Sequence, residues 1–275
     1  MSVEEPTLDR IAVFSRRREF EKAHTLFSRL QLPFEVLSPE PGYSRVGVPA
    51  LICGTSGLGA IHGERTLVCS GWTEYFPASV AVPEQAPSHF DEDVFGEAVI
   101  MFFGPCMADE KRVRLTAHLT GDLTEVLPYI NSTMPRACFN AGTSTLSFME
   151  GARMVSLYAR RIAIGKADNL IDSWSTLEKI RLLVNRTWAQ RHSITPLYTQ
   201  RFKPPALEIY KRLPRTNCRE CGEQTCMAFA VRLWQGEGIP SECRPVFTEQ
   251  HVALRAALLE ICQGLGVNTS RAAVD

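Results

Sequence analysis

The stretch LPRTNCRECGEQTCMAFAVRLWQGEGIPSEC, residues 213–243, contains four of the nine cysteines in the chain. Two residues separate Cys218 from Cys221, and four separate Cys221 from Cys226. Sixteen residues then lead to Cys243. Three thiolates on a compact loop and a fourth further along are the layout that holds an iron-sulfur cluster, because soft sulfur ligands suit its iron. The spacing therefore predicts that these four cysteines bind one cluster per chain, of the 4Fe-4S type.

The residues beside these cysteines suit such a site. Gly222 has no side chain, which lets the backbone approach an inorganic core closely. Cys226 directly precedes MAFAVRLW, a predicted helix, so we expect its thiolate at a helix N-terminus, where the dipole favours negative charge. The basic residues nearby are Lys211, Arg212, Arg215, Arg219 and Arg244. They offset the charge of the cluster, raise its potential or dock an acidic electron-transfer partner, or else they form an ordinary solvated rim.

Zinc is the main alternative for four thiolates, because it binds them in a tetrahedral site. Zinc sites usually have two tight cysteine pairs, whereas Cys226 and Cys243 stand sixteen residues apart. The spacing favours an iron-sulfur cluster over zinc or a metal-free segment.

The segment LPRTNCRECGEQTCMAFA, followed by Cys243, resembles the 4Fe-4S domain in the large subunit of the corrinoid iron-sulfur protein of acetyl-CoA decarbonylase/synthase. The same type of domain occurs in the B subunit of the Rnf electron-transport complex and in reductive activators of corrinoid proteins. The resemblance covers roughly residues 210–246, and it implies the same four cluster ligands. Arg219 replaces a common glycine, and Arg244 separates Cys243 from Pro245. The rest of the chain resembles none of those proteins' other domains, so no corrinoid or membrane function carries over.

Composition limits the class of protein. The 275 residues are 45% hydrophobic and 22% charged, which suits a globular chain with one large domain or two ordinary ones. Basic and acidic residues number 30 each, so no overall field attracts nucleic acid or an anionic membrane. Residues 1–10 lack the apolar core of a signal peptide, and no run approaches the roughly 18 apolar residues of a membrane span. We expect a cytoplasmic protein, whose cysteines serve metal binding, packing or redox chemistry in place of disulfides.

The N-terminal part combines patterns of strands and helices. Residues 11–39 predict a β-α-β unit, and residues 97–104 and 113–121 predict two buried strands in a sheet covered by helices. Residues 145–167 predict a hairpin or meander. A glycine-rich turn is expected at Gly54, Gly57 and Gly59, a strand over 66–70 and a long loop over 77–93.

The C-terminal part has helical spacing. Leu177, Ile180, Val184 and Trp188 line one side of a predicted amphipathic helix, and residues 247–265 predict a final helix. The prolines of RFKPPALEIY, residues 201–210, favour a boundary there. The predicted fold is therefore an α/β (or α+β) region over residues 1–205, with room for two subdomains, followed by a small, mostly helical cluster domain over residues 206–275.

Other motifs carry weaker signals. The remaining N-terminal cysteines are Cys53, Cys69, Cys106 and Cys138. They fall near the ends of apolar runs, where a crevice would allow a second metal site or a reactive thiol, but core packing is the favoured interpretation. The run CGTSGLGA lacks the lysine of a phosphate-binding loop. His62, His89 and His118 show no metal spacing. An exposed recognition patch is one interpretation of Trp72, Tyr75 and Phe76, but packing in the core or at its boundary is the favoured expectation.

Three functions fit these observations. The first is electron transfer to or from a partner protein through the cluster. The second is an accessory role in activating an oxygen-sensitive metalloenzyme or assembling its metal cofactor. The third is an enzyme that reduces a small molecule in the α/β region with electrons from the cluster. A redox or accessory protein is favoured over a stand-alone enzyme, because the cluster ligands are explicit and a substrate site is not.

Overall fold

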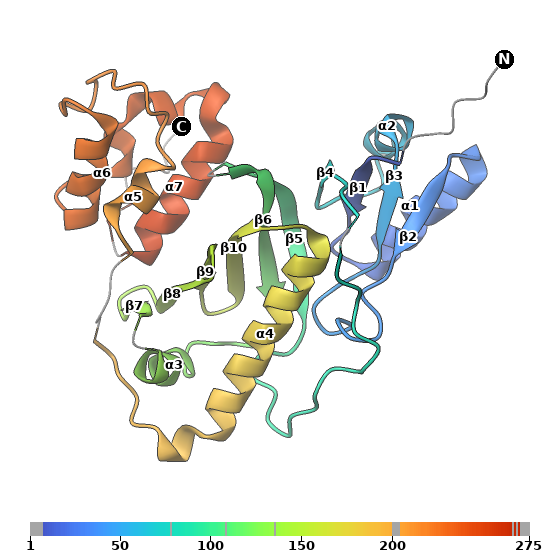
Figure 1. The fold of residues 1–275 in the computed structure, drawn as a ribbon, viewed down its shortest axis with the longest axis horizontal. Helices are drawn as coiled ribbons and strands as arrows, with labels where there is room; N and C mark the ends of the chain where they lie inside the picture. Colours follow the sequence, from blue (N-terminus) through green and yellow to red (C-terminus); the bar gives the residue numbers. More distant parts are fainter. Residues whose placement is uncertain are drawn as a thin grey trace. The chain divides into compact units, whose positions relative to one another are not determined.

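The computed structural model describes residues 8–77, 79–107, 109–134, 136–199, 204–265, 267 and 269. The chain divides into two compact units. Figure 1 shows the helices and strands with their labels. The first unit comprises residues 1–106, 111–123 and 160–189, and the second comprises residues 107–110, 124–159 and 190–275. The predicted domain boundary between residues 205 and 206 falls inside the second unit. That residues 206–275 form a separate domain stays a prediction.

The first unit contains a four-stranded antiparallel sheet in the order β2-β3-β1-β4. The strands are β1 (Arg10–Val13), β2 (Phe34–Leu37), β3 (Ala50–Cys53) and β4 (Gly71–Glu74), and the helices α1 (Arg17–Leu30) and α2 (Thr55–Gly63) connect them. The predicted β-α-β elements are present, but β3 lies between β1 and β2. The connectivity is the split β-α-β-β-α-β arrangement. Phe20 and Phe27 of α1 pack with Leu51 of β3 in its core.

Glycines change two of the expected elements. The glycine-rich run expected to form a turn is the helix α2. A Cβ atom at Gly57 would lie 2.7 Å from the Phe27 ring, so glycine permits the close contact between α2 and α1. The strand expected over 66–70 is instead β4, which starts at Gly71. At Gly71, φ is +140° and a Cβ atom would lie 1.8 Å from the Phe103 carbonyl oxygen, so only glycine fits where β4 meets β5.

A second sheet has six strands in the order β5-β6-β10-β9-β8-β7. The strands are β5 (Ala98–Cys106), β6 (Asp109–Leu119), β7 (Cys138–Asn140), β8 (Thr145–Glu150), β9 (Arg153–Leu157) and β10 (Arg161–Ala167). The predicted strands and meander are therefore confirmed. However, β5 is not buried throughout, because Met101 and Phe102 are 47% and 39% exposed. The predicted amphipathic helix is α4 (Leu170–Ala189), and α3 (Leu127–Thr133) belongs to the second unit.

The C-terminal part of the second unit is mainly helical, as predicted. Figure 1 shows α5 (Ala206–Tyr210), α6 (Cys226–Gln235) and α7 (Val252–Gly264) gathered together. Short 3-10 helices precede α7, which explains its start five residues later than expected: η2 (Pro240–Glu242), η3 (Arg244–Phe247) and η4 (Glu249–His251). Phe229 of α6 and Leu258 of α7 lie in a shared core. In the described part of the chain, no helix is long and apolar enough to cross a membrane.

Candidate metal centre

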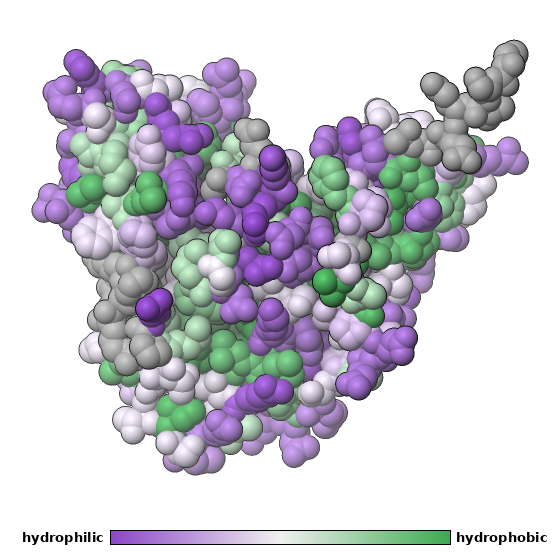
Figure 2. Space-filling view, in the orientation of Figure 1, coloured by the Kyte–Doolittle hydropathy of each residue, from purple (hydrophilic) through white to green (hydrophobic). Residues whose placement is uncertain are grey.

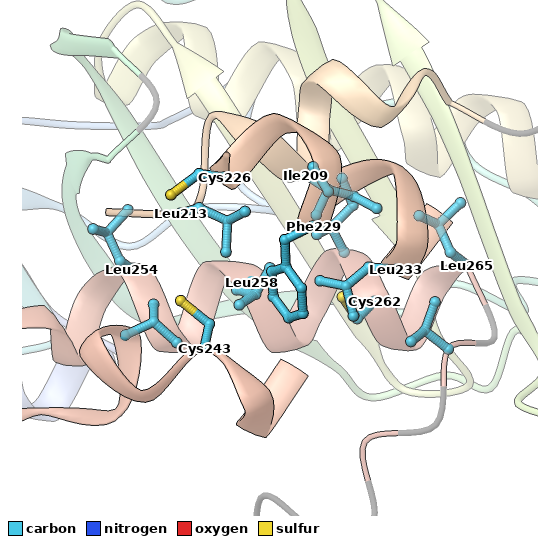
Figure 3. Packing of buried hydrophobic residues seen from close by; sticks show 14 of the residues in the cluster. Ile209, Leu213, Cys226, Phe229, Leu233, Cys243, Leu254, Leu258, Cys262 and Leu265 are labelled. Atoms are coloured by element: carbon cyan, nitrogen blue, oxygen red, sulfur yellow. The ribbon is translucent and has the colours of Figure 1, made fainter. Parts of the chain in front are cut away.

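The four predicted ligands lie in three neighbouring segments of the helical region. Cys218 is exposed and Cys221 half-buried, whereas Cys226 and Cys243 are only 7% and 5% exposed. The pKa of the Cys243 thiol is raised to about 11, mainly by burial and also by the charges of the other three cysteines. Figure 3 shows the sulfurs of Cys226 and Cys243 on the same side of the hydrophobic cluster, with Cys262 apart from them beside Leu233. The fold thus brings the other three predicted ligands within electrostatic reach of Cys243.

The loop that carries Cys218 and Cys221 has an unusual backbone. Arg215, Asn217 and Arg219 have positive φ values of 61°, 50° and 66°, and Gly222 has a φ of 85°. Left-handed residues curl a loop, and turns of this kind direct N–H groups toward an anion. A Cβ atom at Gly222 would meet nothing within 4 Å, so glycine is favoured there by the backbone angle and not by crowding.

The predicted helix begins at Cys226, as expected. Thr225 caps it, since its hydroxyl accepts the Ala228 N–H at 3.1 Å. The Cys226 N–H donates to Oδ1 of Asn217 at 2.8 Å, and the Asn217 N–H donates to Sγ of Cys226 at 3.4 Å. The helix terminus and the N–H donor both favour a negatively charged sulfur.

The backbone N–H of Val246 donates to the Cys243 carbonyl oxygen at 3.1 Å, and this N–H opposes the rise in the pKa of the Cys243 thiol. The Cys243 N–H donates to the Pro240 carbonyl at 3.1 Å, which holds Cys243 in the turn between η2 and η3. Among the predicted ligands, the sulfur of Cys226 accepts a backbone hydrogen bond. Such bonds orient metal-binding thiolates and tune the metal that they hold.

Arg232 of α6 is a charged residue near the cysteines that the sequence analysis did not single out. Its Nη2 atom lies 3.5 Å from the Cys221 carbonyl oxygen, and its Nη1 atom lies 3.4 Å from Oε1 of Glu223. Nη2 also pairs with Oε2 of Glu242, the residue before Cys243. The sequence did contain a signal for these contacts of Arg232. A positive charge interrupts the apolar run MAFAVRLW, and glutamates lie near two of the cysteines.

The basic residues predicted around the site divide into two groups. Arg212 is buried, and its Nη1 atom donates to the Glu208 carbonyl at 2.6 Å and to Oε2 of Glu208 at 3.2 Å. Lys211 pairs with Oε1 of the same glutamate at 2.6 Å. These two residues are therefore part of the packing of α5 and not of a charged rim. Arg215, Arg219 and Arg244 are exposed. Figure 2 shows hydrophilic residues along the outer edge of the helical region.

The remaining cysteines occupy packed positions. Cys53, Cys106, Cys138 and Cys262 are buried. Burial raises the pKa of Cys53 to about 11 and that of Cys262 to about 12. Burial also raises the pKa of Cys69, whose sulfur lies 3.3 Å from the carbonyl oxygens of Val13 and Gly71. Low thiolate content makes the thiols of Cys53, Cys69 and Cys262 poor nucleophiles.

Other predicted candidates do not form a site. A cavity of about 300 Å³ in the first unit is lined by Arg45, Pro87, Ser88, His89, Phe90, Asp93 and Arg181, with no cysteine among them. His62, His89 and His118 are exposed. Contrary to expectation, Trp72 and Phe76 are exposed, by 40% and 62%.

Across the described residues, no three His, Cys, Asp or Glu side chains converge closely enough to hold a single metal ion. In an iron-sulfur cluster the cysteines bind different iron atoms, so such a cluster does not require three ligands to meet at one metal ion.

The cysteine-rich segment is similar to part of several known proteins. Residues 213–245 match the family model described as "Putative Fe-S cluster". A stretch of 54 residues is 54% identical to the acetyl-CoA decarbonylase/synthase complex subunit gamma 2 of Methanosarcina thermophila, covering 20% of this chain and 12% of that protein. A stretch of 51 residues is 49% identical to the corrinoid/iron-sulfur protein large subunit of Moorella thermoacetica, covering 18% of this chain and 11% of that protein.

The chain thus spans about one eighth or less of the length of these relatives. No solved structure matches the chain. The predicted resemblance is confirmed for the segment around the four cysteines. Residues 213–245 match the iron-sulfur cluster domain that the corrinoid iron-sulfur protein large subunit and the decarbonylase/synthase gamma subunits also contain.

Proposed function

We propose that Cys218, Cys221, Cys226 and Cys243 bind one 4Fe-4S cluster, and that the protein passes electrons to or from a partner protein in the cytoplasm. The observation that carries this proposal is the meeting of three cysteine-bearing segments inside the part of the chain that matches an iron-sulfur family. When bound, such a cluster supplies reversible one-electron chemistry.

Several features of the chain fit a bound anionic cluster. The left-handed loop around Asn217 and Arg219 curls the backbone beside Cys218. The N-terminus of α6 places partial positive charge at Cys226. The N–H group of Asn217 bonds the sulfur of Cys226 and holds its orientation. This donor stabilises a thiolate, the form in which cysteine binds iron.

The position of the ligands favours electron transfer. Cys218 is exposed, while Cys226 and Cys243 are anchored in the core of the helical region. These residues would hold a cluster with Cys218 on the solvent side, where a partner could approach, and with Cys226 and Cys243 fixed in the core. Arg215, Arg219 and Arg244 are exposed in the same segments, and they suit a partner with an acidic surface.

The direct test is the content of iron, acid-labile sulfide and zinc in the anaerobically purified chain, with electron paramagnetic resonance before and after reduction with dithionite. About four iron and four sulfide per chain, with a signal in the reduced state, support the proposal. About eight of each would point to a second cluster that uses further cysteines. Stoichiometric zinc without iron would overturn the redox function.

The names of the relatives favour a second candidate function, an accessory role toward a metalloenzyme. The matched proteins are subunits of a decarbonylase/synthase complex and a corrinoid/iron-sulfur protein. Some four fifths of this chain lies outside the match, which leaves the first unit free to recognise a specific target. In this case the reduced chain should reactivate one oxidised metalloenzyme and leave general acceptors untouched, whereas simple electron transfer predicts that small acceptors are also reduced.

A further inference from the structure

We infer that Arg232 is the positioning residue that holds the three ligand-bearing segments around the cluster and balances the carboxylates beside it. The inference rests on the proposed cluster site and goes beyond it, because Arg232 is not a ligand. Three observations carry it: the contacts of the guanidinium group, the charges that it neutralises and the space reserved for it.

The guanidinium group connects every segment that carries a ligand. Arg232 stands on α6, the helix that begins at Cys226. Its Nη2 atom lies 3.5 Å from the Cys221 carbonyl oxygen and also pairs with Oε2 of Glu242, which precedes Cys243. Its Nη1 atom lies 3.4 Å from Oε1 of Glu223 in the loop after Cys221. A planar group with five donors is suited to joining several oxygen acceptors in fixed geometry.

The charged groups paired with Arg232 are carboxylates, whereas an anionic cluster is stabilised by positive charge nearby. Glu223 and Glu242 lie in the ligand-bearing segments, and without a cation they would repel a cluster held by four thiolates. Arg232 and these glutamates are all partly shielded from solvent, with side-chain exposures of 28%, 28% and 38%. Arg232 therefore reduces a repulsion that water does not fully screen.

The chain also leaves space for this side chain. A Cβ atom at Gly238 would lie 3.1 Å from Nε of Arg232 and 3.5 Å from Oε2 of Glu242. Nε itself is buried without a hydrogen-bond partner, and the guanidinium lies 5.3 Å from the centre of the Phe229 ring. Burying an unpaired donor is unfavourable, so the conformation is held by the contacts of the two Nη atoms.

The test compares Arg232→Met with Glu242→Gln in the full chain, using iron release to a chelator and the cluster's reduction potential. Both variants break the contact between Arg232 and Glu242 that joins the ligand-bearing segments. Both should therefore release iron about 10- to 100-fold faster than the wild type. Their potentials should move in opposite directions. Arg232→Met leaves two unbalanced carboxylates and should lower the potential, whereas Glu242→Gln removes one carboxylate and should raise it. A tenfold change in the one-electron equilibrium corresponds to about 59 mV.

Arg160→Met is the matched control, because it removes an arginine that pairs with Asp122 at the surface of the first unit. It should change neither quantity. Arg232→Lys should recover the potential better than the rate of iron release, since lysine restores the charge but not the planar fork. Wild-type potential and iron release in Arg232→Met, or shifts of the same sign in both main variants, would overturn the inference. A wild-type chain without iron would instead overturn the proposed cluster.

Discussion

Asn217 and Cys226 hold each other through two hydrogen bonds within the proposed site. The side-chain oxygen of Asn217 accepts the Cys226 N–H at 2.8 Å, and the Asn217 N–H donates to the Cys226 sulfur at 3.4 Å. The Cys226 N–H is one of the amides at the start of α6 that lack a partner within the helix. One residue of the loop thus completes the helix terminus and orients a predicted ligand.

Asn217→Ala should expose the first turn of α6 to solvent exchange. The change removes the acceptor for the Cys226 N–H and places alanine at a φ of 50°, which asparagine tolerates better. We expect a loss of about 1 kcal/mol, which corresponds to roughly fivefold faster amide exchange in this turn. Hydrogen exchange followed by mass spectrometry measures it. Asn217→Asp keeps the acceptor and should exchange more slowly than Asn217→Ala; equal rates would contradict the role of the side chain.

Cys221→Ala should abolish or degrade the cluster and destabilise the helical region. Removal of a ligand leaves three thiolates, and metal binding contributes folding free energy in small metal domains. Iron and sulfide content and the visible absorption of the purified variant test this expectation. Cys106→Ala is the matched control, because Cys106 is a buried cysteine of the first unit and should leave iron content intact. Full iron in Cys221→Ala, or equal loss in Cys106→Ala, would show that the ligands are misassigned.

Thr225→Ala should weaken α6 at its first residue. The Thr225 hydroxyl accepts the Ala228 N–H, and loss of such a cap costs about 1 kcal/mol. The iron-free chain should therefore show a lower free energy of unfolding for this helix, measured by hydrogen exchange of the α6 amides. Thr225→Ser retains the hydroxyl and should behave like the wild type. An unchanged exchange rate in Thr225→Ala would mean that packing alone holds the helix end.

Cys53 should make the first unit less stable at alkaline pH. Burial raises its folded pKa to about 11, above the ordinary value near 9. The neutral thiol is favoured in the folded state, so this contribution is complete below pH 9 and is lost as the pH rises toward 11. Over that window the wild type should lose up to about 1.4 kcal/mol per pH unit more than Cys53→Ala. Urea unfolding at pH 8, 9.5 and 10.5 measures both slopes, and identical slopes would refute the prediction.

Arg219→Glu should change the reaction of the reduced cluster with charged oxidants. The side chain is exposed beside Cys218, and reversal of its charge weakens the attraction of anions. Oxidation by ferricyanide should become several-fold slower at low salt, and oxidation by a cationic ruthenium hexaammine should become faster. Stopped-flow absorption measures both rates. Arg160→Glu, in the first unit, should alter neither, and equal changes with both oxidants would exclude electrostatic docking at Arg219.

Local patterns were enough to predict much of this protein from its sequence. The spacing of Cys218, Cys221, Cys226 and Cys243 indicated the iron-sulfur segment that the family comparison confirmed. The apolar periodicities located most strands and helices, including the start of α6 at Cys226. These features depend on neighbours close in the chain, so they are visible without tertiary contacts.

The tertiary structure alone decided which elements and charges meet. Strand β3 pairs between β1 and β2, because sheet order follows from pairing between distant segments and not from periodicity. The helix α2 lies against Phe27 of α1 at Gly57, a close contact between segments that are distant in the chain. Arg212 is buried with Glu208, and Arg232 joins Glu223 to Glu242 across the cysteine segments. Similar basic residues thus received different roles, since burial and charge pairing are set by the folded environment and not by residue type.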